Sequence, residues 1–300
     1  MKGDFMALKQ IGVVGCGAMG AGIAQLALQA GYTVVVREID QGLLEKGLGR
    51  IKNGLEKYQQ KGTLNTEDKE AMLQRLSGTV SFTDFATSDL VIEAAFEDIQ
   101  IKKELFKSLD GICKKEAILA SNTSSLSVSD MAASTSRPTQ LIGMHFFNPA
   151  TVMPLVEIIT TVATNAAVVQ TAVEFGKSLG KVPVLAKDNA GFIVNLLLTP
   201  YLMDAMRAVG EGVASIEHID MGMKLGCNYP MGPLMLADFI GLDVLIKGAT
   251  TMYEEYKDKR YAPPPILKRM VTMGYFGLKS GRGFYDWSDP KKPVPSNLGL

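Results

Sequence analysis

The sequence predicts an α/β protein in which a doubly wound, mostly parallel sheet is followed by an all-helical C-terminal domain. Short runs rich in Val, Ile and Leu alternate with longer helical patterns over the first 187 residues. These runs are apolar almost throughout, which is typical of parallel strands covered by helices on both faces. After about residue 187 the strand-like runs stop, and helical patterns broken by Gly and Pro continue.

The individual elements follow from the same patterns. Strands are predicted at 10–15, 33–38, 89–95, 117–122, 141–147, 155–161 and 183–187. Helices are predicted at 18–30, 40–61, 66–76 and 98–110, and after the sheet at 191–212, 216–226, 231–256 and 264–274. We therefore expect an α/β domain at 1–187 and a helical domain at 188–300. The segment 289–300 is expected to be a loose tail.

Composition and charge exclude several classes of protein. Lys and Arg number 31 against 31 for Asp and Glu, so there is no electrostatic footprint for nucleic acid or a membrane surface. The apolar stretch 191–203 is too short and too polar to span a bilayer, and the first residues contain no signal-peptide core. Three widely spaced cysteines indicate a reducing compartment. A cytoplasmic protein is expected.

A glycine-rich loop joins the first predicted strand to the first predicted helix. The pattern Gly15-x-Gly17-x-x-Gly20 is weak evidence alone, but here an apolar strand precedes it and a second strand ends in Glu38. Gly15 permits a tight turn, Gly17 lets a pyrophosphate approach the backbone, and Gly20 lets the helix pack on the strand. The phosphates would lie at the helix N-terminus, where free N–H groups favour anions. This context predicts a Rossmann-type dinucleotide site.

The acidic residue after the second strand favours NAD over NADP. A carboxylate at Glu38 would bind the ribose hydroxyls and repel a 2′-phosphate. Arg37 is adjacent and could accept that phosphate, so the NAD interpretation requires Arg37 to point along the other face of the strand. Cys16, inside the loop, is interpreted as a small packing residue.

Polar residues interrupt apolar runs at three places beyond the loop. The segment Ser121–Ser125 follows a predicted strand at the edge where ligands bind in open α/β sheets, although these residues could instead cap a helix. His145 and Glu157 lie on consecutive predicted strands. A buried carboxylate needs a partner, and it would fix the tautomer of an imidazole acting as a base. The alternatives are a core histidine and a solvent-facing glutamate.

Two further polar residues are less specific. Asn195 interrupts an apolar run early in the second domain, where it could bind a loop backbone or face a cleft between domains. His218 lies in a polar context and is interpreted as a surface or structural residue. The sequence shows no HExxH, Cys/His cluster or paired carboxylates, so no metal is expected.

Taken together, these features make the chain similar to the L-3-hydroxyacyl-CoA dehydrogenase family, and most similar to its bacterial short-chain members. The resemblance covers essentially the whole chain. The motifs that carry it occur in the family's order and spacing: GCGAMGAGIAQ, VIEAAFED, ASNTSSLSV, GMHFFNP, PLVEII, KDNAGFIVN, MGPLMLADFIGLD and GLKSGRGFYDW.

The resemblance implies NAD-dependent interconversion of an (S)-3-hydroxyacyl-CoA and a 3-ketoacyl-CoA. It makes His145 the acid/base and Glu157 its orienting partner, while Ser124 and Asn195 bind the substrate oxygen and Lys61 helps hold coenzyme A. The dinucleotide contacts that it implies are Gly15, Gly17, Ala18, Met19, Gly20, Glu38, Glu97, Lys102, Ser124, Asn148 and Lys279. The family also implies a homodimer formed by the helical domain, whose Met-rich segments would suit either an interface or a core.

The sequence departs from the family pattern at two positions. Glu38 replaces the usual aspartate, and Gly54 stands where the family often has a polar residue near coenzyme A. Two other functions are also considered. A dehydrogenase of a free 3-hydroxy acid would use a catalytic lysine, whereas this chain has the His–Glu pair. A non-catalytic NAD-binding module would not depend on His145.

Overall fold

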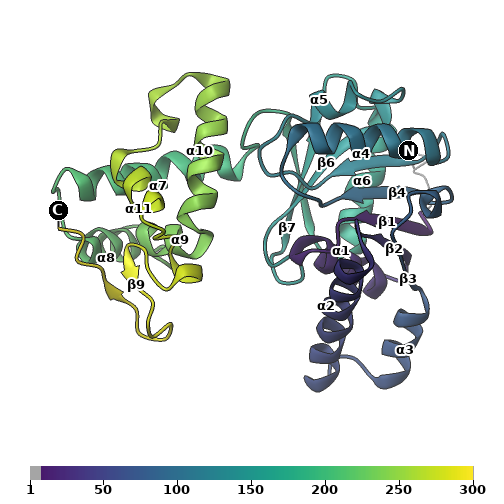
Figure 1. Ribbon diagram of the computed structural model, residues 1–300, viewed down its shortest axis with the longest axis horizontal. Helices are drawn as coiled ribbons and strands as arrows, with labels where there is room; N and C mark the ends of the chain where they lie inside the picture. Colours follow the sequence, from purple (N-terminus) through teal and green to yellow (C-terminus); the bar gives the residue numbers. More distant parts are fainter. Residues whose placement is uncertain (1–7, 300) are drawn as a thin grey trace. The chain divides into compact units, whose positions relative to one another are not determined.

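The computed structural model describes residues 8–299, which form two compact units that divide between Phe192 and Ile193. The first unit contains an eight-stranded sheet of order β3-β2-β1-β4-β5-β6-β7-β8 (Figure 1). Its strands are β1 (Gln10–Val14), β2 (Thr33–Arg37), β3 (Leu76–Thr79), β4 (Leu90–Glu93), β5 (Ile118–Ser121), β6 (Leu141–Phe146), β7 (Leu155–Thr160) and β8 (Val182–Lys187). All neighbours are parallel except the β6–β7 pair.

The strand order reverses beside β1, which pairs with β2 on one side and β4 on the other. In open α/β sheets ligands bind outside the carboxyl ends of the strands at such a switch point. The sequence places the glycine loop at this point, directly after β1. The strand order and the glycine motif therefore indicate the same edge of the sheet as the ligand-binding edge.

Helices cover both faces of this sheet (Figure 1). Residues of α1 (Ala18–Gln29), α2 (Gln41–Gln60) and α6 (Ala166–Ser178) form one apolar core with the strands. On the other face, α4 (Ile99–Ile112), α5 (Val128–Ala132) and the 3-10 turn η1 (Thr83–Phe85) contribute to a second core. The predicted doubly wound architecture is confirmed.

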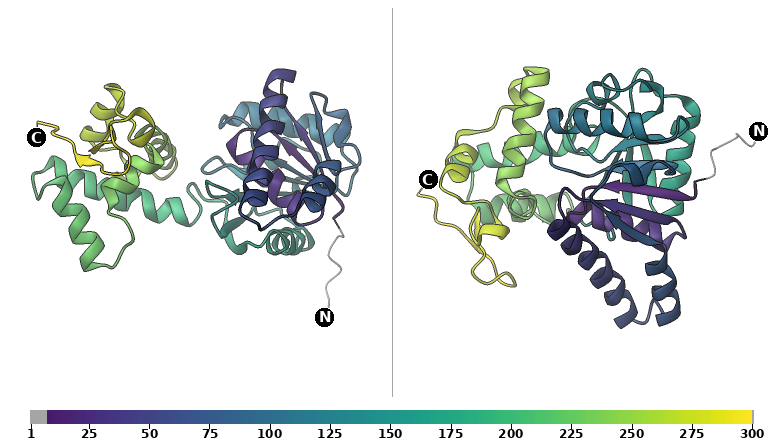
Figure 2. Two further views of the ribbon diagram at one scale, coloured as in Figure 1. Left: turned by 90° about the horizontal axis from the view of Figure 1, so that it is seen from below. Right: turned by 45° about the vertical axis from the view of Figure 1, so that its right-hand side comes forward.

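Helix α3 (Thr66–Gln74) packs beside α2, and the pair extends away from the sheet (Figures 1 and 2). The short strand β3 follows and was not predicted. Its sequence, LSGT, has no apolar run, and all of its residues are exposed or half-buried at the sheet edge. Its pairing with β2 is therefore not visible in the local pattern. Another 3-10 turn, η2 (Pro138–Gln140), precedes β6.

The second unit is largely helical. Its helices are α7 (Val194–Gly210), α8 (Ile216–Gly226), α9 (Pro233–Ile240), α10 (Leu242–Tyr256) and α11 (Pro265–Thr272), with 3-10 turns η3 (Lys259–Tyr261) and η4 (Leu278–Ser280). The helix predicted at 231–256 is two helices, because Gly241 adopts a φ of 99° and breaks the run. In residues 8–299, no helix has the length and apolar character needed to cross a membrane.

The expectation of a loose tail at 289–300 is wrong for part of this segment. Val294–Pro295 form β10, which pairs antiparallel with β9 (Tyr285–Asp286). The N–H of Ser296 also donates to the carbonyl of Phe284 at 2.8 Å. The partner strand lies only eight to ten residues earlier, but both strands are two residues long and show no alternating or apolar run that would predict the pairing.

Two buried carboxylates hold the C-terminal part of the second unit together. Asp238, 1% exposed, accepts hydrogen bonds from the backbone N–H groups of Phe284 and Tyr285 and from Trp287 Nε1 at 2.8–2.9 Å. Asp220 accepts from Tyr285 Oη at 2.8 Å and from two N–H groups at the start of α9. Burial raises the pKa of Asp238 to about 6. These contacts explain why the ADF and GFYDW motifs occur together.

Candidate active site

The glycine loop after β1 shows two different reasons for its glycines. A Cβ on Gly15, whose φ is 89°, would lie 2.7 Å from the carbonyl oxygen of Ala94, and a Cβ on Gly20 would lie 1.8 Å from the carbonyl of Gly15. These two are required by packing between the loop, β4 and α1. A Cβ on Gly17 would meet no atom within 4 Å. The space above Gly17 therefore suits a ligand that approaches the backbone.

The N-terminus of α1 has the property that an anion site requires. Its N-cap, Gly17, makes no side-chain hydrogen bond to the first turn, which contains Ala18, Met19 and Gly20. Within residues 8–299, six helices are capped by an Asp, Asn or Ser side chain (α2, α3, α4, α5, α6 and α8), whereas α7, α9, α10 and α11, like α1, have no side-chain cap. Of these uncapped helices, α1 is the one that begins at the glycine loop after β1. The free N–H groups and the helix dipole at α1 fit the pyrophosphate of a dinucleotide.

Glu38 follows β2 and faces the glycine loop. Its Oε1 accepts a hydrogen bond from the N–H of Cys16 at 2.6 Å. Arg37 points elsewhere: its Nε donates to the carbonyl of Val80 at 3.2 Å, and its guanidinium lies 3.8 Å from the ring centroid of Phe82. The NAD interpretation requires Arg37 to point along the other face of the strand, and these contacts meet that requirement.

Cys16 is fully buried in the loop, against Gly47 of α2. Burial, with a smaller contribution from the charge of Glu38, raises the pKa of its thiol to about 12. A thiol with these properties is a packing group and not a nucleophile.

His145 and Glu157 lie directly opposite each other in the antiparallel β6–β7 pair. Their atoms Nδ1 and Oε2 are 2.7 Å apart, and the side chain of Glu157 is fully buried. When Glu157 is ionised, Nδ1 carries the proton and donates it to the carboxylate, which leaves Nε2 available for proton exchange. The rings of Phe147 and Phe192 lie 4.5 and 5.8 Å from the imidazole.

The segment Ser121–Ser125 follows β5, and its side chains have separate partners. Ser121 Oγ donates to Glu93 at 2.7 Å, and Thr123 Oγ1 donates to Glu97 at 2.5 Å. Asn122 Oδ1 accepts from the N–H of Phe146 at 2.9 Å, just beyond the end of the β5–β6 ladder. The cap of α5 is Ser127, outside the segment. The helix-cap interpretation of Ser121–Ser125 is therefore wrong.

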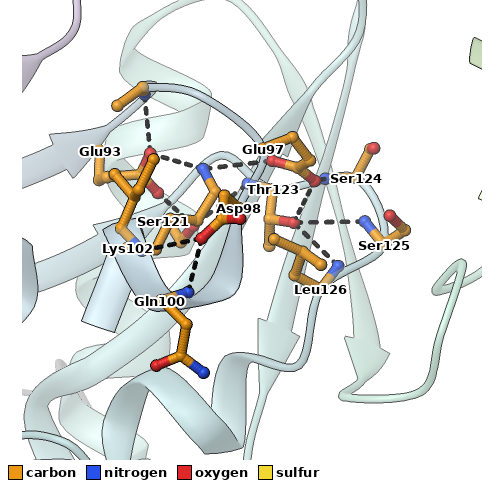
Figure 3. Close-up of polar contacts among 12 residues, drawn as sticks. Glu93, Glu97, Asp98, Gln100, Lys102, Ser121, Thr123, Ser124, Ser125 and Leu126 are labelled. Carbon is orange, nitrogen blue, oxygen red and sulfur yellow. Dashed lines mark hydrogen bonds and ion pairs between the residues drawn. The ribbon is translucent and has the colours of Figure 1, made fainter. Parts of the chain in front are cut away.

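Lys102 and Glu97, predicted to contact the dinucleotide, belong to one polar network (Figure 3). Lys102 is 1% exposed and lies between two carboxylates, 2.5 Å from Glu93 Oε1 and 3.2 Å from Glu97 Oε2. Glu97 is exposed and accepts from the N–H of Ser124 at 3.0 Å. In this structure the ammonium of Lys102 is directed to protein carboxylates and not to solvent.

A buried lysine that the sequence did not indicate holds the loop after His145. Asn148 is exposed on this loop, close to the strand end. The Nζ of Lys181 donates to the carbonyls of Ala150 and Met153 at 2.6 and 2.8 Å. Burial lowers the pKa of Lys181. No motif surrounds Lys181, so only the structure could assign it to this loop.

The predicted coenzyme A contact Lys61 is exposed at the C-terminal end of α2. Gly54, where the family often has a polar residue, faces α1. A Cβ there would lie 2.0 Å from Gln25 Oε1, so a larger residue at position 54 would have to displace the end of the Gln25 side chain.

The remaining predicted residues belong to the second unit. Asn195 lies half-buried in the first turn of α7. Lys279 forms an ion pair with Asp243 at 2.5 Å within that unit. His218 is exposed on α8. Over residues 8–299, no group of three or more His, Cys, Asp or Glu side chains is placed to hold a metal ion.

The switch-point loop, the carboxylate after β2 and the open helix N-terminus define a Rossmann-type NAD-binding oxidoreductase. Family models agree. Residues 10–189 match the NAD binding domain of 3-hydroxyacyl-CoA dehydrogenase, and residues 191–287 match its C-terminal domain. The chain belongs to the 3-hydroxyacyl-CoA dehydrogenase family.

Individual relatives are similar over nearly the full chain. A probable 3-hydroxybutyryl-CoA dehydrogenase of Deinococcus radiodurans is 46% identical, covering 93% of this chain and 100% of the relative. The 3-hydroxybutyryl-CoA dehydrogenase of Clostridioides difficile is 43% identical over 93% and 99% of the two chains. The crystal structure of (S)-3-hydroxybutyryl-CoA dehydrogenase from Ralstonia eutropha superposes with a TM-score of 0.91 at 43% identity, covering 94% and 100%.

Proposed function

We propose that this chain interconverts a short-chain (S)-3-hydroxyacyl-CoA, with 3-hydroxybutyryl-CoA as the preferred substrate, and the corresponding 3-ketoacyl-CoA. The observation that carries the proposal is the buried His145–Glu157 pair, with Nδ1 and Oε2 2.7 Å apart. The names of the relatives support the substrate class. The pair supplies a base of fixed tautomer, which oxidation of an alcohol requires.

Each residue has a defined part in this mechanism. Nε2 of His145 accepts the proton of the 3-hydroxyl, and the carboxylate of Glu157 stabilises the imidazolium that forms. Ser124 and Asn195 bind the substrate oxygen and orient C3. NAD, when bound, supplies the acceptor for the hydride leaving C3. In the reverse direction His145 returns the proton as the acid.

The remaining predicted contacts are part of the same proposal. Glu38 binds the ribose hydroxyls, and Glu97, Lys102, Ser124 and Lys279 contribute to dinucleotide binding, with Asn148 on the nicotinamide side. Lys61, exposed on α2, binds a phosphate of coenzyme A. Binding of the acyl-CoA therefore depends on Lys61, which lies outside the sheet edge, as well as on the catalytic groups.

The test is a spectrophotometric assay of NADH formation with (S)-3-hydroxyacyl-CoAs of increasing chain length, NADP+ and free 3-hydroxybutyrate. We expect NAD+-dependent oxidation of the four-carbon thioester, and a loss of about 10²-fold or more in kcat in His145→Ala. Oxidation of the free acid without oxidation of the thioester would favour the alternative dehydrogenase. NAD binding without turnover would favour a non-catalytic module.

We also propose that the chain forms a homodimer through its second unit. Met221 and Leu225 lie one turn apart on α8, and they are 45% and 77% exposed. Leu197 on α7 is 68% exposed. Apolar side chains of this size are typical of an interface core. Light scattering should give twice the mass of the chain, and Leu225→Glu should give the monomer. A monomeric wild type at micromolar concentration would contradict this.

We place the protein in the cytoplasm. Its cysteines Cys16, Cys113 and Cys227 are all free thiols, and Cys227 is exposed, as suits a reducing compartment. Fractionation of the source cells, followed by immunodetection, tests this placement.

A further inference from the structure

The last residue of β4, Glu93, is a fully buried carboxylate to which no part of the proposed mechanism assigns a role. Its Oε1 accepts from Lys102 Nζ at 2.5 Å and from the N–H of Ala95 at 2.7 Å, and its Oε2 accepts from Ser121 Oγ at 2.7 Å (Figure 3). A buried charge is tolerated only when it is paired and hydrogen-bonded. Glu93 satisfies both requirements, and its contacts join β4, β5 and α4.

Lys102, the partner of Glu93, connects this buried carboxylate to Glu97 on the exposed side of the site. The ammonium of Lys102 also lies 3.2 Å from Glu97 Oε2, so two carboxylates share one buried cation. With Glu93 neutral, Glu97 would become the sole counter-ion of Lys102. The attraction between them would then increase, because the buried ammonium would lack its nearer partner.

Glu97 in turn orders the loop that contains Ser124. Its other oxygen, Oε1, accepts from the N–H of Ser124 at 3.0 Å and from Thr123 Oγ1 at 2.5 Å. Any displacement of Glu97 toward Lys102 stretches these two contacts. The position of Ser124 is therefore linked, through Glu97 and Lys102, to a carboxylate that lies three contacts away in the interior.

We propose that Glu93 is a positioning residue, which shares the ammonium of Lys102 so that Glu97 stays free to hold the backbone of Ser124. The catalytic consequence rests on the proposed function, because there Ser124 binds the substrate oxygen. Loss of that orientation lowers kcat more than it weakens binding of a substrate anchored elsewhere.

The primary test compares Glu93→Gln with Asp130→Asn. The control removes a more exposed carboxylate that pairs with the neighbouring Lys103 at 3.5 Å. In Glu93→Gln we expect hydrogen–deuterium exchange at the Ser124 amide of the NAD-free protein to increase at least about tenfold. We also expect kcat to fall at least about tenfold, with the acyl-CoA KM within about threefold. The control should change neither.

A second variant distinguishes the effect of the position of the residue 93 carboxylate from the effect of its charge. Glu93→Asp keeps the buried charge but withdraws the carboxylate by one methylene from Lys102, and it should fold if Glu93→Gln does not. We expect a smaller increase in Ser124 exchange and a smaller loss of kcat. Wild-type exchange at Ser124 in both folded variants, or in Glu93→Asp alone if Glu93→Gln does not fold, would overturn the proposal. A wild-type protein that does not oxidise 3-hydroxyacyl-CoA would contradict the proposed function but leave the exchange result valid.

Discussion

The carboxylate of Glu157 and the imidazole of His145 face each other because the two residues occupy opposite positions in adjacent antiparallel strands. The sequence already contained the elements of this pairing: two apolar runs, a polar residue within each, and a short connection. It could not give the register. A slip of one residue would have turned one of the two side chains to the opposite face of the sheet.

This geometry predicts the effect of Glu157→Gln. An amide can donate to Nδ1, which stabilises the tautomer with the proton on Nε2 and removes the base. We expect kcat to fall by about 10²-fold or more, with the acyl-CoA KM little changed. Steady-state kinetics with Glu116→Gln as an exposed control tests it. A kcat in Glu157→Gln equal to that of the control would contradict the role of the pair.

The environment of Glu38 makes a second prediction about cofactor choice. Removing this carboxylate removes the repulsion of a 2′-phosphate and also a partner of the ribose hydroxyls. In Glu38→Ser we expect the KM for NAD+ to rise about tenfold and kcat/KM for NADP+ to increase, because the repulsion of the 2′-phosphate is removed. Unchanged discrimination between NAD+ and NADP+ would show that another group selects the cofactor.

At the scale of residues, the local sequence pattern also fails to predict the partner of a side chain when that partner is distant in the sequence. The segment Ser121–Ser125 is a row of similar polar residues, yet Ser121, Asn122 and Thr123 bind three different elements. Similarly, the sequence presents Gly54 as a departure from the family pattern near coenzyme A, whereas in the structure this glycine lies against the end of the Gln25 side chain on α1. Neighbours of this kind are set by tertiary packing, which single-sequence patterns do not contain.

At the scale of elements, the sequence predicts helices and strands best where the periodic pattern of apolar residues is strong. The strands buried on both faces and the helices α1, α2 and α4 were predicted within a few residues. Prediction failed for β3, which has no apolar run, and for the break at Gly241, where one predicted helix is two. It also failed for β10, whose pairing with β9 stabilises a Pro-containing segment. These elements depend on partners and not on their own periodicity.

The contacts of Asp238 predict how the stability of the second unit depends on pH. Its pKa in the folded protein is about 6, above the ordinary 3.8, so the folded state binds the proton more tightly than the unfolded state. The free energy of unfolding should therefore fall as pH rises from about 4 to about 6, by at most about 3 kcal/mol, and then become constant with respect to this group.

The measurement follows urea unfolding through the fluorescence of Trp287, whose Nε1 donates to Asp238. Asp238→Asn should be less stable throughout, because an amide offers fewer acceptors to three N–H donors. The difference in unfolding free energy between wild type and variant should change across this pH range. A difference that stays constant from pH 4 to 7 would show that Asp238 does not titrate there.

At the scale of the whole molecule, the predicted site residues fall into two groups, one on each side of the division between Phe192 and Ile193. The first unit contains the glycine loop, Glu38 and the His145–Glu157 pair, whereas the second contains Asn195 and Lys279. The two family models divide the chain in the same region, at 10–189 and 191–287. NAD binding should therefore stabilise mainly the first unit, because the groups that fit the pyrophosphate and the adenosine ribose all lie there.

Calorimetric unfolding with increasing NAD+ tests this distribution. At a free NAD+ concentration of 100 times Kd, binding should stabilise the folded protein by about 2.7 kcal/mol. Gly17→Asp should abolish the effect without unfolding the protein, because a Cβ at Gly17 meets no atom within 4 Å but a carboxylate there would repel the phosphates.

Gly49→Asp is the matched control, since a Cβ at this α2 glycine also meets nothing within 4 Å. It should keep the full stabilisation by NAD+. If Gly17→Asp retains it too, the dinucleotide does not approach the backbone at Gly17, and the open helix N-terminus of α1 is not its phosphate site. If Gly17→Asp loses stability without NAD+, the glycine serves the fold and not the ligand.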